Sequence, residues 1–88
     1  MTEQIPIEEL KDLAETAEKQ KSLYGEEIKN LRYLVEKIYP IEDTEMRKEI
    51  FKDQLRYFTH LTNSPLYNSR PEGQKVLRKA VGLIERLI

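Results

Sequence analysis

The sequence has 88 residues, of which 39% are apolar and 35% are charged, and it contains no cysteine. This length supports one hydrophobic core, so we expect a single domain over residues 1–88. The lack of cysteine excludes disulfides and thiolate metal sites. No apolar run approaches the roughly 20 residues that span a bilayer. The acidic opening segment 1–9 is unlike a secretory signal, so we expect neither a transmembrane segment nor export.

The net charge of -1 conceals a difference between the two halves of the chain. Residues 1–44 carry six Lys or Arg against eleven Asp or Glu, whereas residues 45–88 carry nine against five. Charge separation of this kind bears on the choice of partner rather than on the fold. We therefore expect the basic second half to supply the contact surface.

The first predicted helix covers about residues 6–21, with Pro6 in a first-turn position that helices tolerate. At about 100° per residue its apolar side chains share one face. These are Ile7, Leu10, Leu13, Ala14 and Ala17. Because two of the five are alanines, we expect this helix to bury the least area.

The second predicted helix covers about residues 25–38. Its apolar side chains alternate at spacings of four and three residues, which is typical of a helical bundle. They are Tyr24, Ile28, Leu31, Val35 and Ile38, with Leu34 widening the face. Pro40 is expected to force Tyr39 out of helical geometry and end the helix.

The third predicted helix covers about residues 44–62 and starts at an Asp43 or Thr44 cap. Its apolar side chains cover nearly half of its circumference, which predicts a central position. They are Met46, Ile50, Phe51, Leu55, Tyr57, Phe58 and Leu61.

A loop over residues 63–70 precedes the fourth predicted helix, about residues 70–88. Ser69 and Glu72 have the spacing of a capping box, and Pro71 suits the first turn. With no alternating strand pattern in the chain, the sequence predicts an all-α, antiparallel four-helix bundle.

Catalytic and metal chemistry find little support in the residues. His60 is the only histidine, and helical spacing places it on the charged face of the third helix. The three glycines are isolated and form no phosphate-binding loop. We therefore expect no catalytic site, no metal and no cofactor.

Parts of the sequence are compatible with two other functions. A nucleic-acid-binding or regulatory interaction domain could use the basic stripe Lys48, Lys52 and Arg56 with the last helix, but the sequence pI of about 5.9 and interleaved acidic residues oppose nucleic acid as the partner. A helical enzyme of the chorismate mutase type would need arginines in its core. The arginines here fall mainly on polar faces or helix ends.

An aromatic pair, a threonine, two variable residues and Thr-Asn close the third predicted helix, as Tyr57-Phe58-Thr59-His60-Leu61-Thr62-Asn63. In this string, and in the order of its helical segments from Ile28 to Leu87, the chain resembles the enterocin A type of bacteriocin immunity protein. The likeness covers about two thirds of the chain.

The resemblance implies a cytoplasmic four-helix bundle that protects its producer against a class IIa, pediocin-like bacteriocin. Such proteins bind the bacteriocin-occupied mannose phosphotransferase permease at the inner face of the membrane, and they are not enzymes. In that family the C-terminal half governs which bacteriocin is resisted. This sequence ends at Ile88, within its last predicted helix, without the tail that many relatives carry.

Seven residues of the basic half lie where the family's determinants would lie, and we expect them to line the surface that contacts the partner. They are Lys52, Arg56, His60, Tyr67, Arg70, Arg78 and Lys79. The bacteriocin that is resisted and the oligomeric state stay open.

Overall fold

The computed structural model describes residues 5–88 and contains four α-helices: α1 (Pro6–Gln20), α2 (Gly25–Tyr33), α3 (Thr44–Thr62) and α4 (Pro71–Glu85). A π-helix, Leu34–Ile38, extends α2, and a 3-10 helix, Pro65–Tyr67, lies between α3 and α4. The expected all-α fold with four helices is confirmed. The first four residues of the acidic opening segment lie outside the described residues. No helix within residues 5–88 is long and apolar enough to cross a membrane.

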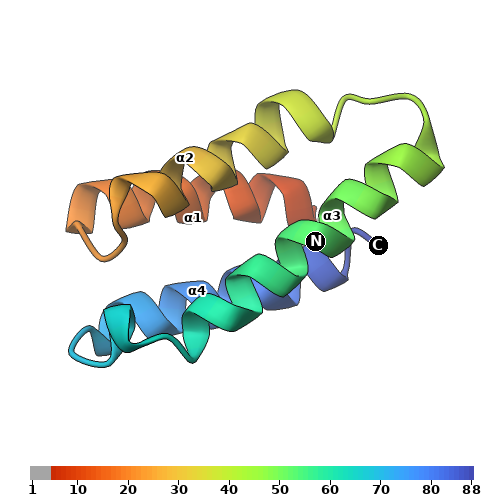
Figure 1. Ribbon diagram of the computed structural model, residues 1–88. Helices are drawn as coiled ribbons and strands as arrows, with labels where there is room; N and C mark the ends of the chain where they lie inside the picture. The colour runs from red at the N-terminus through yellow and green to blue at the C-terminus, as the bar shows by residue number, and fades with distance from the viewer. Residues whose placement is uncertain (1–4) are drawn as a thin grey trace.

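The four helices form two hairpins, α1 with α2 and α3 with α4 (Figure 1). α4 packs against both α3 and α1, and α1 packs against both α2 and α4. The backbone of α3 comes close to α4 and the two short helices but not to α1 or α2, so the expectation that it is the central helix is wrong. α4 occupies the more central place because it joins the two hairpins.

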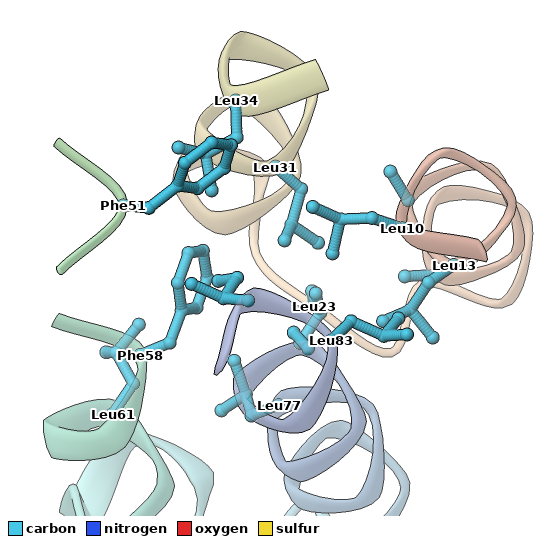
Figure 2. Packing of buried hydrophobic residues seen from close by; sticks show 14 of the residues in the cluster. Leu10, Leu13, Leu23, Leu31, Leu34, Phe51, Phe58, Leu61, Leu77 and Leu83 are labelled. Carbon is cyan, nitrogen blue, oxygen red and sulfur yellow. The ribbon is translucent and has the colours of Figure 1, made fainter. Parts of the chain in front are cut away.

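The core draws leucines and aromatic side chains from every helix. Figure 2 shows Leu10 of α1 pointing toward Leu31 of α2, and Phe51 of α3 pointing toward Leu34. All four of these side chains are fully buried. Burying one such side chain contributes roughly 1.5–3 kcal/mol relative to leaving it in water, so the core accounts for most of the favourable energy.

The predicted apolar face of α1 is confirmed in full, because Ile7, Leu10, Leu13, Ala14 and Ala17 are all buried. α1 ends at Lys21, which has left-handed backbone angles (φ 54°). The amide of Lys21 bonds to the Glu18 carbonyl oxygen and that of Ser22 to the Ala17 carbonyl oxygen. This arrangement satisfies the last carbonyls of a helix, and it usually employs glycine.

The inward face of α2 is rotated from the predicted one. Leu31, Leu34 and Ile38 are buried as expected, but the residue that continues this stripe toward the N-terminus is Glu27, which is 4% exposed. Ile28 and Val35 are only half-buried, and Tyr24 is exposed. A charged side chain therefore takes an inward position that periodicity assigned to apolar neighbours.

The end of the second helix differs from expectation at Tyr39. Its backbone angles are helical (φ -56°, ψ -39°), and its amide donates to the Leu34 carbonyl oxygen at 2.9 Å, five residues back. The preference of a residue before proline for extended geometry is thus overridden here. Arg47 donates to the Tyr39 carbonyl oxygen at 3.2 Å and lies over the Tyr39 ring, which holds this connection against α3.

α3 begins as predicted at an Asp43 cap, whose side chain accepts a hydrogen bond from the Met46 amide at 3.1 Å. Its apolar face is less buried than its width suggested. Only Phe51, Phe58 and Leu61 are buried, whereas Met46 is 54% exposed. The first turns of α3 lie beyond the helices that could cover them, because the backbone of α3 approaches that of the second helix only at its π-helical end.

α4 begins differently from the prediction. The capping box of Ser69 and Glu72 does not form, because the cap position falls on Arg70 and no side chain caps the helix. Pro71 does occupy the first turn. Close packing at Gly73 places the start of α4 instead: a Cβ atom there would lie 2.5 Å from the Ser22 carbonyl oxygen.

Two glycines of α4 are expected to respond oppositely to alanine. Gly73→Ala should destabilise the protein by about 1–3 kcal/mol, because the new methyl group collides with the Ser22 carbonyl and the Tyr67 ring. Gly82→Ala should stabilise it by about 1 kcal/mol, because Gly82 lies inside the helix with open space around it. Urea unfolding of both variants measures these changes, and equal shifts would contradict the packing at Gly73.

Candidate binding surface

The predicted basic ridge of α3 is present on its outward side. Lys52, Arg56 and His60 are exposed and follow one another at intervals of four residues. Lys52 pairs with Glu49 (3.7 Å) and Arg56 with Asp53 (3.9 Å), in both cases three residues apart on the same helix. Exposed pairs of this kind add little stability, but they leave the ridge nearly neutral.

A shallow hollow lies beside His60 at the C-terminal end of α3. It has a volume of about 340 Å³ and is lined by Leu55, Arg56, Thr59, His60 and Asn63. Half-buried Leu55 provides an apolar side chain between polar neighbours. The ridge thus offers a small apolar contact next to the imidazole.

The string that carries the family resemblance has clear structural roles. The hydroxyls of Thr59 and Thr62 donate to carbonyl oxygens four residues back, at 2.7 and 2.9 Å. The side-chain amide of Asn63 donates to the Thr59 carbonyl oxygen at 3.4 Å. Phe58 is fully buried, and the Tyr57 hydroxyl bonds across to α2. The string therefore bonds the last turns of α3 internally and anchors them to the core and to α2.

The expectation that Tyr67 lines a contact surface is wrong. Its side chain is fully buried in the 3-10 helix, and its hydroxyl donates to Glu27 Oε2 at 2.5 Å. The same hydroxyl accepts a hydrogen bond from the Tyr24 amide at 3.2 Å. Tyr67 consequently ties the α3–α4 loop to the beginning of α2.

Glu27 is the functional group that sequence reasoning missed. Its second carboxylate oxygen accepts a hydrogen bond from the Tyr57 hydroxyl at 3.2 Å, so two tyrosines from different elements share one buried carboxylate. No Lys or Arg pairs with Glu27 in the part of the chain that the structure describes. The sequence places Glu27 four residues before Leu31, on the same side of the helix. That this side is buried is seen only in the packed structure.

The two tyrosine hydroxyls hold their protons more tightly than usual. Burial, followed by the hydrogen bond to Glu27, raises the pKa of Tyr67 far above its ordinary value of 10.0. Burial and the negative charge of Glu27 also raise the pKa of Tyr57. We call Tyr24, Glu27, Tyr57 and Tyr67 the tyrosine–glutamate network.

Arg70 also connects the two loops, at the end of the molecule where Tyr67 lies. Its guanidinium lies 4.3 Å from the centre of the Tyr24 ring and donates to the Lys21 carbonyl oxygen at 3.1 Å. A cation over an aromatic ring gains roughly 0.5–2 kcal/mol, depending on exposure. Arg70 is half-buried, and its guanidinium takes part in contacts that join the two loops.

Arg78 and Lys79 are exposed on α4, as expected for contact residues. Neither forms an ion pair within residues 5–88. The structure thus divides the seven predicted residues by their internal partners. Lys52 and Arg56 are paired along α3, whereas Tyr67 and Arg70 join the loops. His60, Arg78 and Lys79 have no such partner in that range.

Comparison with models of known protein families gave no match, and comparisons with curated proteins and with solved structures gave none either. Within the described residues, no three histidine or acidic side chains gather in a way that could hold a metal ion.

Tyr67→Phe is expected to destabilise the protein by about 1–3 kcal/mol, because the buried Glu27 carboxylate loses a hydrogen-bond donor. Stability should also depend on alkaline pH. Tyr57 and Tyr67 keep their protons to higher pH in the folded protein than in the unfolded chain, whose tyrosine pKa is about 10. Their contribution is therefore complete below about pH 10 and declines as the pH rises further.

Urea unfolding at neutral and alkaline pH, with tyrosinate absorbance recorded in parallel, tests both expectations. Tyr67→Phe should show a smaller alkaline loss than the parent protein. Tyr33→Phe is the matched control, because the Tyr33 side chain is 51% exposed. Identical pH profiles for the parent and Tyr67→Phe would contradict the role assigned to this hydroxyl.

Proposed function

We propose that this chain is a cytoplasmic immunity protein that protects its producer from a class IIa bacteriocin. In this proposal it binds the bacteriocin-occupied mannose phosphotransferase permease from the cytoplasmic side. The observation that carries the proposal is the Tyr57–Asn63 string at the end of α3, in a chain with four helices. The bonds made by Thr59, Thr62 and Asn63 support the use of this string as a family signature, because these positions have a physical role in the last turns of α3.

Binding rather than chemistry is the proposed mode of action. The Glu27 carboxylate and the Tyr57 and Tyr67 hydroxyls are hydrogen-bonded to one another, so these polar groups are committed to the fold. The six arginines are exposed or half-buried, which does not favour a dicarboxylate site in the core. Exposed cations without an ion pair among residues 5–88, such as Arg78 and Lys79, are suited to acidic segments of another protein.

Expression in a strain sensitive to pediocin-like peptides tests the proposal. Cells that carry the gene should need a higher concentration of at least one such peptide to stop growing than cells with an empty vector. The physical reason is occupation of the permease from inside, so peptides that kill without this permease should remain fully active. A lack of protection against a broad panel of class IIa peptides would contradict the proposal.

A core-disrupting variant provides the control for nonspecific effects of expression. Phe58→Asp places a charge at a fully buried position and should abolish folding and protection together. Retention on duplex DNA that falls steeply with added salt would instead favour the nucleic-acid-binding alternative.

A further inference from the structure

The outward face of α4 differs in charge from the outward face of α3. On α3, three cations (Lys48, Lys52, Arg56) are interleaved with three anions (Glu45, Glu49, Asp53). On α4, the middle of the exposed face carries Lys75, Arg78 and Lys79, with acidic residues only at its two ends. Of these two helices, α4 therefore presents the larger group of exposed cations without an ion pair among residues 5–88.

These three cations have no ion-pair partner among residues 5–88. Arg86, one turn beyond, pairs with Glu9 of α1 at 3.5 Å and belongs to the junction between the two helices. Lys75, Arg78 and Lys79 are all exposed. Their charges are consequently available to carboxylates of another molecule.

Gly82 lies between these cations and Arg86 on the same face, seven residues after Lys75. It is exposed, and a Cβ atom there would meet nothing within 4 Å. Glycine inside a helix costs about 1 kcal/mol relative to alanine. At Gly73 close packing explains the residue, whereas at Gly82 no contact within the described protein does. Gly82 therefore leaves a position without a side chain on the face of α4 that carries Lys75, Arg78 and Lys79.

We propose that the outward face of α4, centred on Gly82, is the docking site for an acidic α-helix of a protein partner. The partner helix crosses α4 at Gly82, where the missing side chain lets the two backbones approach closely. Its carboxylates bond to Lys75, Arg78 and Lys79. The identity of the partner as a cytoplasmic segment of the permease rests on the proposed function, but the chemistry of the site does not.

The combination of charge and shape favours a helix over other anions. Membrane surfaces are recognised by clusters of about four to eight basic residues, and this face of α4 has three unpaired basic residues. A nucleic acid is a polyanion that the net charge of -1 does not attract at long range. Neither needs a position without a side chain, whereas the spacing of two packed helices depends directly on the side chains at their crossing point.

The full-length protein, labelled with ¹⁵N, can be titrated with a defined probe. The probe is a synthetic alanine-rich helical peptide with glutamates on one face, and its control has glutamine in their place. Amide shifts should map to residues 75–86 with the acidic peptide and be much smaller with the control. The variants Gly82→Leu and Arg78→Glu/Lys79→Glu should each weaken binding about tenfold or more.

Gly25→Leu and Lys29→Glu are matched controls on α2. Gly25 also has no neighbour within 4 Å of a Cβ position, and Lys29 is exposed. Both controls should bind the peptide as the parent does. Gly82→Ala adds a test of sign, because it should stabilise the fold while weakening peptide binding, a combination that a purely structural role would not produce.

Several results would overturn the inference. Absence of peptide binding, binding that maps elsewhere, or affinity unchanged in Gly82→Leu each does so. Preferential binding of vesicles rich in phosphatidylserine, or of duplex DNA, assigns this face of α4 to a different ligand. Cell assays separate the two proposals. If Gly82→Leu protects cells as well as the parent does, only this docking site is contradicted. If the parent itself gives no protection, the proposed function is contradicted, and the peptide titration still tests the docking site.

Discussion

The buried Glu27 carboxylate, shared by two tyrosine hydroxyls, joins the two hairpins, and much of the structure follows from it. Burial of Glu27 is tolerable only because Tyr57 and Tyr67 supply hydrogen bonds in place of water. Meeting these donors turns α2 so that Glu27 faces inward. Insertion of Tyr67 draws the α3–α4 loop against the α1–α2 loop, and α4 can begin there only because Gly73 has no side chain.

The extent of each helix was predictable from the sequence because the spacing of apolar residues and the position of prolines depend on local geometry. Which part of an apolar face becomes buried was not predictable in this way. On α3, Met46 follows the same periodicity as Phe51 but ends up exposed, because no other helix reaches the first turn. On α2, a glutamate is buried in place of its apolar neighbours. This was not predictable because its hydrogen-bond partners lie 30 and 40 residues away in sequence.

The candidate surface was predictable to the same limited degree. Helical spacing places Lys52 and Arg56 outside and their acidic neighbours three residues away, and the structure shows both pairs formed. Tyr67 looked like a loop aromatic available to a partner, and its burial depends on a carboxylate that sequence alone does not bring near. The polar side chains Thr59, Thr62 and Asn63 of the Tyr57–Asn63 string bond to carbonyl oxygens of their own helix, a role that the string by itself does not reveal.

The bonds at the loop end also have a consequence for the kinetics of folding. The contacts Tyr24–Tyr67, Glu27–Tyr67 and Lys21–Arg70 connect positions 43, 40 and 49 residues apart, whereas each hairpin forms from contacts that are closer in sequence. Closing such long loops is entropically costly, so these contacts should form late. Interactions that form after the transition state govern the rate of unfolding. The contacts between the two loops are therefore expected to affect the rate of unfolding more than the rate of folding.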